Sequence, residues 1–191
     1  MSALPLLYQT IIGRSLVTDG VQLISLGGSG AMEQFIKVLG REWNKQLILI
    51  LDRDMEKSKS KLIQELGLVE NQTVFYVGSR EIEDAFDDTT WLCILNSEFP
   101  SQVDDDPWTL GEIAGWRSSQ KFSSTLTQAV NKKCKNQPIL KPQIGLAIGK
   151  WHATNDVRVP DEIANAMRGV QEIAKSAWSQ EGERARREYV C

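Results

Sequence analysis

The sequence has a single histidine, His152, among its 191 residues, and only three cysteines, at positions 93, 134 and 191. One histidine excludes any catalysis that needs two, including zinc hydrolysis by an HExxH motif. The cysteines are odd in number, widely spaced and form no CxxC pair, so the sequence supports neither a disulfide framework nor a zinc site. We therefore expect a reducing, cytoplasmic setting.

Long hydrophobic runs are also lacking. The apolar run Leu47–Leu51 is far below the roughly 18 residues that span a bilayer, and the opening MSALPLL lacks the basic region of a secretory signal. We expect no membrane partner. The net charge of −3 means that contact with nucleic acid would need a local basic patch. A composition of 41% hydrophobic and 25% charged residues is typical of a globular protein and excludes collagen, a coiled-coil rod and a wholly disordered chain.

Helical patterns and short apolar runs alternate over the first eighty residues. The apolar runs predict buried strands over Val21–Leu26, Gln46–Leu51 and Thr73–Val77. Helical spacing is found over Leu4–Leu16, around Met32–Leu39 and over Lys57–Leu66. This alternation predicts an α/β fold, with a mostly parallel sheet, right-handed crossovers and helices on both faces.

The second half of the chain is expected to be helical. Glu81–Leu95 has an interrupted helical pattern, and Pro100–Trp108 is expected to be a loop. Further helices are predicted over Gln120–Lys135, Pro142–Trp151 and Pro160–Trp178. We therefore divide the chain into an α/β domain over residues 1–95 and a helical extension over residues 96–191, packed on that domain.

The first motif with chemical content is Asp52-Arg53-Asp54, directly after the Ile/Leu strand. Ligands of open α/β sheets bind at the carboxyl ends of strands, and residues i and i+2 of an extended segment face the same way. Two carboxylates held together repel each other unless a cation lies between them, and oxygen ligands suit Mg²⁺ or Mn²⁺. A solvated turn after a strand is the alternative interpretation.

The second motif is the acidic segment of residues 80–84, Arg-Glu-Ile-Glu-Asp, directly after the third predicted strand. If the two strands are neighbours, both acidic clusters border one crevice and could hold one or two divalent ions. Two ions roughly 4 Å apart stabilise attack and departure in phosphodiester cleavage. The alternative is a first helical turn enriched in acids, which complements the helix dipole.

Two weaker features accompany the acids. The turn of residues 27–30, Gly-Gly-Ser-Gly, could cradle a phosphate with its backbone N–H groups, or it could simply be a tight turn between strand and helix. Lys141 precedes a predicted helix, and Lys150 lies near the end of that helix. Either lysine could stabilise charge developing on a phosphate, or serve only solubility.

Taken together, these motifs resemble the TOPRIM fold. More narrowly, the chain resembles the C-terminal TOPRIM region of OLD-family (overcoming lysogenization defect) ATP-dependent endonucleases, which act in phage defence. The matching stretches cover roughly Leu6–Ile173, and they are LISLGGSGAMEQFIKVL, LILILDRDMEKSK, VFYVGSREIEDAF and LKPQIGLAIGKW…VPDEI. The resemblance implies a TOPRIM-like parallel sheet and DNA cleavage with acid-bound Mg²⁺ or Mn²⁺.

The resemblance also implies roles for individual residues. Asp52 and Asp54 match the family's aspartate pair and Lys141 its active-site lysine, so these three are the candidate catalytic residues. Glu81 and Glu83 fall where the second acidic pair lies, so the candidate metal ligands are the four acids together. The glycines at positions 27 and 28 match the family's glycine turn. No organic cofactor is implied.

One departure from the family pattern bears on activity. TOPRIM domains open with a strand that ends in a glutamate, which binds metal and serves as a general acid or base. Here no glutamate precedes Glu33, and the P-loop ATPase portion is absent. We therefore expect a nuclease domain that is impaired, or that depends on a separate ABC-type ATPase subunit or on a homodimer.

Two other functions remain open. The chain could be a non-catalytic remnant or interaction module that keeps the fold but not the reaction. The DxD pair could instead serve a haloacid-dehalogenase phosphatase or a sugar-nucleotide transferase. The phosphatase motif requires Thr or Val two residues after the second Asp, whereas residue 56 is Glu, so the phosphatase is the least favoured.

Overall fold

The computed structural model describes residues 3–26, 31–35, 47–102, 106–119, 121–134 and 138–188, with side chains as far as residue 179. The described elements are, in order, α1 (Leu4–Ile12), β1 (Leu49–Asp52), the 3₁₀ helix η2 (Arg53–Met55), α3 (Glu56–Glu65), β2 (Val74–Val77), the 3₁₀ helix η3 (Ile82–Ala85), α4 (Asp88–Glu98), α5 (Leu110–Arg117), α6 (Phe122–Cys134), α7 (Lys141–Thr154) and α8 (Asp161–Glu188). The expected α/β class is confirmed. In the part described, however, helices predominate and the sheet has two strands.

The two strands are parallel neighbours. Leu49 of β1 lies opposite Val74 of β2, and Asp52 lies opposite Val77 at the other end of the ladder. All four residues of β2 are buried, as expected for a strand of a parallel sheet that is covered on both faces. The predicted strands around residues 46–51 and 73–77 are thus confirmed, as is their parallel pairing.

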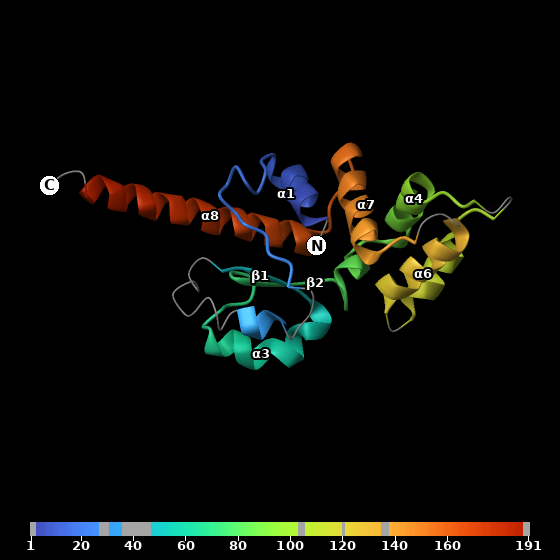
Figure 1. The fold of residues 1–191 in the computed structure, drawn as a ribbon, viewed down its shortest axis with the longest axis horizontal. Helices are drawn as coiled ribbons and strands as arrows, with labels where there is room; N and C mark the ends of the chain where they lie inside the picture. Colours follow the sequence, from blue (N-terminus) through green and yellow to red (C-terminus); the bar gives the residue numbers. More distant parts are fainter. Residues whose placement is uncertain are drawn as a thin grey trace.

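Helices cover both faces of this small sheet. Phe75 and Val77 point into the main core, which they share with α1 and α8, whereas Val74 and Tyr76 belong to a second core on the other face with Leu68 and partly buried residues of α3. The alternation follows the period of two along a strand. Figure 1 shows the resulting layers, with α8 above the sheet and α3 below it.

The remaining helices extend the main core away from the sheet. The buried side chains of this part come from α4, α5, α6 and α7, and they include Trp91, Ile94, Leu95, Ile113, Leu126, Val130, Ile144 and Ile148. α1 packs against both α7 and α8, so the first helix lies beside helices from the second half of the chain (Figure 1).

The strand predicted over Val21–Leu26 is wrong. These residues form no helix or strand, and Gln22–Ile24 are exposed. The segment follows a turn in which Gly20 has a φ of 69° and the N–H of Val21 donates to the carbonyl of Leu16. β-propensity expresses packing against neighbouring strands, and this segment makes no ladder with β1 or β2.

Other predictions differ in detail. The interruption expected within Glu81–Leu95 is real, because η3 and α4 are separate. α5 was not predicted at all. The glycine turn at residues 27–30 and the second half of the helix predicted around Met32–Leu39 lie outside the described residues, although residues 31–35 are helical.

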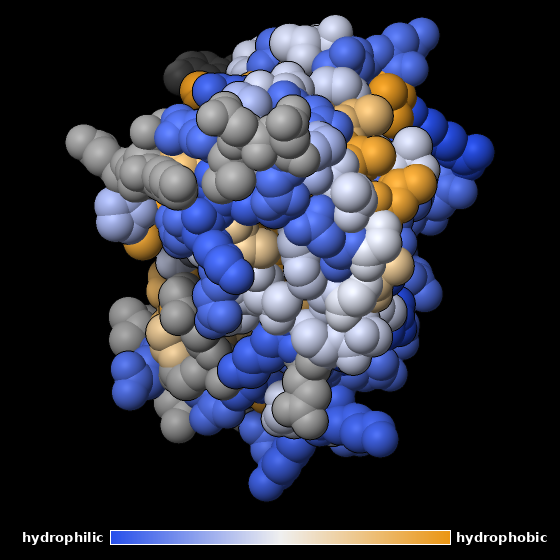
Figure 2. All heavy atoms as spheres, turned by 90° about the vertical axis from the view of Figure 1, so that its right-hand side faces the viewer, coloured by the Kyte–Doolittle hydropathy of each residue, from blue (hydrophilic) through white to orange (hydrophobic). Residues whose placement is uncertain are grey.

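The side of the molecule that carries α4, α6 and α7 is mainly polar over the described residues (Figure 2). Figure 2 shows this side as largely hydrophilic, with hydrophobic residues gathered in a small area near its upper right edge. Among the helices in the described ranges, none is both long enough and apolar enough to cross a membrane.

Candidate functional site

The two acidic motifs meet at the carboxyl ends of β1 and β2. The N–H of Asp54 donates to the carbonyl of Arg80 over 3.1 Å, and the N–H of Ile82 donates to Oδ1 of Asp52 over 2.8 Å. Because the strands are adjacent and parallel, both loops leave the same edge of the sheet. The two acidic motifs therefore share one edge of the sheet, as expected. The hydrogen bond from Ile82 to Asp52 joins the two loops.

Arg53, between the two aspartates, also joins the two loops by hydrogen bonds. Its Nε donates to the carbonyl of Gly78 over 3.2 Å and its Nη2 donates to the carbonyl of Tyr76 over 3.3 Å. Reading the motif as DxD treats this position as a spacer. In the structure it is a positioning residue that binds the end of β2.

The turn after β2 requires glycine. Gly78 has a φ of 74°, and a Cβ added there would lie 1.7 Å from the carbonyl oxygen of Glu81. The N–H of Gly78 donates to Oε1 of Glu162 over 3.0 Å. The close approach of Gly78 to Glu81 turns the acidic segment back over the end of the sheet, and Glu162 links this turn to the first turn of α8.

Glu81 caps the start of α6. Its Oε2 accepts from the N–H of Ser123 over 3.0 Å and its Oε1 accepts from the Ser123 hydroxyl over 2.8 Å. Burial by itself raises the pKa of Glu81, but these hydrogen bonds and the charge of Lys141 outweigh it, and the pKa is lowered. Glu81 is therefore held as a carboxylate.

Lys141 reaches the same cluster from the start of α7. Its Nζ lies 3.3 Å from Oε1 of Glu81 and 3.6 Å from Oε1 of Glu83. Burial by itself lowers the pKa of Lys141, but the charges of Glu83, Glu81 and Asp52 raise it above its ordinary value. Lys150, the other candidate lysine, lies on the same helix about 13 Å farther along its axis, so Lys141 is the lysine that meets the acids.

Glu83 is the most buried acid of the cluster. Its side chain is 4% exposed, and its Oε2 is buried with no hydrogen-bond partner. Burial raises the pKa of Glu83, and the carboxylates of Glu81 and Asp52 raise it further against the opposing charge of Lys141. Burial also raises the pKa of Asp52, although the hydrogen bond from Ile82 and the charge of Lys141 oppose this rise.

The structure thus brings together four of the five candidate residues. Glu81 and Glu83 pair with the ammonium group of Lys141, and Asp52 is near enough for its charge to raise the pKa of Lys141. Asp54 is exposed, at the rim, and its charge acts on Asp52. Within the described residues, no three His, Cys, Asp or Glu side chains are spaced so that they could hold a metal ion as they stand.

Sequence reasoning missed a second polar network that fixes the acidic segment. The side chain of Asp84 is fully buried and lies 3.7 Å from the Nε of Arg80 and 3.8 Å from an Nη of Arg117. Arg117 also donates to the carbonyls of Asp84 and Phe86. The RExED pattern itself signals Asp84, but nothing local signals Arg117, which belongs to the unpredicted α5.

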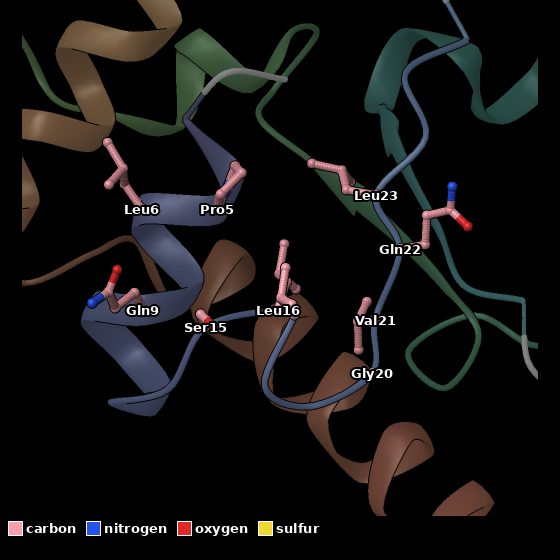
Figure 3. Close-up of a pocket in the computed structure, with 10 residues that line it drawn as sticks. Pro5, Leu6, Gln9, Ser15, Leu16, Gly20, Val21, Gln22 and Leu23 are labelled. Atoms are coloured by element: carbon pink, nitrogen blue, oxygen red, sulfur yellow. The ribbon is translucent and has the colours of Figure 1, made fainter.

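Two hollows lie away from the acidic cluster. One, of about 530 Å³, is bounded by α1 and the loop that follows it, and Figure 3 shows Leu6, Leu16 and Leu23 along its sides. Another, of about 470 Å³, lies between α1 and the end of α7. Neither hollow is lined by Asp52, Asp54, Glu81, Glu83 or Lys141. The first hollow is mainly apolar, so the charged groups at the end of the sheet are the stronger indication of a functional site.

Comparison of the chain with models of protein families, with curated proteins and with solved structures found no match.

Proposed function

We propose that this chain is an OLD-type TOPRIM endonuclease domain, which cleaves phosphodiester bonds of DNA with Mg²⁺ or Mn²⁺ bound by acids. The observation that carries the proposal is the pairing of Glu81 and Glu83 with Lys141 at the carboxyl ends of two adjacent parallel strands, where Asp52 accepts from the N–H of Ile82 in the same acidic segment. Three carboxylates and one ammonium leave an excess of negative charge, which attracts a divalent cation.

The donor chemistry of the cluster fits a hard divalent cation. All the donors are carboxylate oxygens, which suit Mg²⁺ and Mn²⁺ rather than zinc or copper. Oε2 of Glu83 is buried and lacks a partner, and a buried carboxylate oxygen in this state is stabilised by a cation. Asp52, Asp54 and Glu83 are the residues that would hold the ion, with Glu81 contributing once its hydrogen bonds to Ser123 are released.

The bound ion would supply Lewis-acid activation of the phosphate and of the attacking water. The chain's own groups have distinct tasks beside it. Lys141 would place positive charge next to the phosphoryl oxygens, where negative charge develops during cleavage. The backbone N–H of Ile82 orients Asp52, and Arg53 fixes the loop that carries both aspartates.

We propose that activity depends on a partner. In the family that the chain resembles, a further glutamate on another strand supplies general acid or base chemistry, and the four acids assigned here to the metal do not include it. A separate ABC-type ATPase subunit, or a second copy of the chain, is the partner expected to complete the site on DNA.

Nicking of supercoiled plasmid DNA tests this function. The chain is assayed with Mn²⁺, alone and with a candidate ATPase subunit, and Asp52→Asn is expected to reduce nicking by about 100-fold or more. Asp156→Asn, an exposed acid after α7, is the matched control and should leave nicking unchanged. No nicking in either mixture when protein saturates the DNA, or nicking that survives Asp52→Asn, would contradict the proposal.

A non-catalytic interaction module is the second candidate. It is favoured by the two hydrogen bonds from Ser123 to Glu81, which use this carboxylate to cap a helix. This candidate predicts weak or absent binding of Mg²⁺ and Mn²⁺. Calorimetric titration that detects tight binding, lost in Asp52→Asn, would argue against it.

A further inference from the structure

Lys141 is the counter-charge of the acidic cluster. Among the ion pairs of the described residues, Glu81 and Glu83 pair with Lys141 and with no other basic side chain. Glu83 is 4% exposed, and a carboxylate so deeply buried is strongly destabilising without a cation beside it. The fold therefore needs a positive charge at this point whenever Glu83 is ionised.

The position of Lys141 in its own helix is unfavourable. Lys141 is the first residue of α7, and a positive charge at a helix N-terminus is repelled by the helix dipole. A lysine in this position gains nothing from α7 itself, so the carboxylates of Glu81 and Glu83 account for its placement.

Lys141 is also the member of the cluster that is free to move. Its side chain is 49% exposed, whereas those of Glu81 and Glu83 are 16% and 4% exposed. A lysine ammonium rides on a flexible stem of four carbons and is readily hydrated. The ammonium can therefore leave for solvent without unfolding α7, while Glu83 stays in place.

We propose that Lys141 is a resident counter-cation, which neutralises the acidic cluster in the metal-free chain and which a divalent cation must displace from Glu81 and Glu83. The inference rests on the proposed function, because it takes the acidic cluster to be a site for Mg²⁺ or Mn²⁺. The ammonium lies 3.3 Å from Oε1 of Glu81 and 3.6 Å from Oε1 of Glu83, so an ion that binds both carboxylates competes with it for them.

Titration with Mn²⁺ alone, in the absence of DNA, tests the displacement. Lys141→Met removes the charge and keeps an unbranched side chain that is one atom shorter, and it is expected to bind Mn²⁺ about tenfold more tightly than the unmodified chain. Lys133→Met is the matched control, since Lys133 pairs with Glu112 and Asp106, which lie outside the acidic cluster. It should leave Mn²⁺ affinity unchanged.

Thermal unfolding in EDTA and in Mn²⁺ gives a second readout. Lys141→Met should unfold at a lower temperature than the unmodified chain in EDTA, because Glu83 loses its counter-charge, and Mn²⁺ should restore most of the difference. Equal or weaker Mn²⁺ binding by Lys141→Met would overturn the inference and leave the nuclease proposal standing. If neither chain binds Mn²⁺, the inference and metal-dependent cleavage both fail.

If Lys141→Met does not fold, the unmodified chain still decides the question. With ¹³C-labelled lysine, the Cε resonance of Lys141, assigned with Lys141→Arg, should move when Mg²⁺ is added, and that of Lys133 should not. A Lys141 resonance that stays in place at saturating Mg²⁺ would overturn the displacement.

Discussion

At the scale of single residues, the acidic cluster makes a prediction about pH. The raised pKa of Glu83, caused mainly by burial, means that the folded chain binds its proton more tightly than the unfolded chain. Stability contributed by this group is therefore lost as pH rises from the ordinary glutamate range through the raised pKa. Glu83→Gln, which keeps the shape and removes the charge, should be about 1 kcal/mol more stable than the unmodified chain at pH 8 in EDTA.

The measurement is urea unfolding at several pH values. The advantage of Glu83→Gln should shrink as pH falls through the pKa of Glu83, because the unmodified side chain then becomes neutral as well. Glu65→Gln, whose side chain is 59% exposed, is the control and should show little effect. An advantage that stays constant from pH 4 to pH 8 would contradict the assignment.

His152 gives a prediction that can be read directly. It is 2% exposed, and its Nδ1 lies 3.2 Å from the carbonyl of Val157, so in the neutral ring Nδ1 carries the proton. Burial lowers the pKa of His152 below its ordinary value, although the Val157 carbonyl and the charge of Asp87 oppose this shift. Because folding lowers this pKa, the stability that His152 contributes is present above pH 6.5 and is lost as pH falls.

The chain has one histidine, so NMR gives a single imidazole Cε1–H resonance to follow. Its titration midpoint should lie below 6.5 in the folded chain and return to about 6.5 in urea. A folded-state midpoint at or above the value in urea would contradict the assignment.

The sequence predicted most of the acidic cluster at this scale, for a local reason. Asp52 follows one strand and the acidic segment follows the next, and parallel neighbours bring such positions to one edge. It could not predict that Glu81 caps α6, because Ser123 is 42 residues farther along the chain. Nor does a pattern of acids reveal which carboxylate is buried, and burial is what distinguishes Glu83 from Asp54.

At the scale of elements, the turn after β2 is expected to be sensitive to substitution of its glycine, Gly78. Gly78→Ala would place a Cβ 1.7 Å from the carbonyl oxygen of Glu81 in a backbone conformation with a φ of 74°. We expect a loss of about 3 kcal/mol or more, since the strain and the overlap can be relieved only by moving the acidic segment.

Chemical denaturation measures this loss. Gly67→Ala is the matched control, because Gly67 has a φ of 64° but nothing within 4 Å of an added Cβ. It should lose only the conformational part, about 1–2 kcal/mol. Equal losses in the two variants would show that the contact with Glu81 is not important.

Helices were predicted where amphipathic spacing is clear, and missed where it is not. α5 contains two glycines in LGEIAGWR, and its four apolar residues have only weak helical periodicity. A usable signal was present at its start, where Thr109 and Glu112 form a capping box. The strand predicted over Val21–Leu26 is the opposite case, an element that was predicted but is not formed. A run of strand-forming residues does not show whether a partner strand is available to pair with it.

At the scale of the whole molecule, the contact between α8 and the sheet joins the last helix to a strand from the first half of the chain. A Cβ at Gly169 of α8 would lie 2.4 Å from Cζ of Phe75 in β2, so the absence of a side chain there lets the helix approach the strand. Through this layer, α8 reaches the turn at Gly78 by way of Glu162. The position of the acidic site thus depends on a helix more than eighty residues away in sequence.

Gly169→Ala should therefore destabilise the chain by about 1–3 kcal/mol, because the ring of Phe75 is buried in a packed core and cannot retreat freely. Gly115→Ala in α5 is the matched control. Nothing lies within 4 Å of a Cβ at Gly115, so alanine there should stabilise the helix by about 0.5–1 kcal/mol.

Adding Phe75→Leu to Gly169→Ala distinguishes a local clash from a general loss of helix packing. Leucine shortens the side chain that the new Cβ meets, so the double variant should be destabilised by less than the sum of the two single effects, as expected for residues in contact. If the two losses simply add, then α8 does not pack on β2 at Gly169. The link from α8 through Glu162 to the acidic segment would lose its structural basis as well.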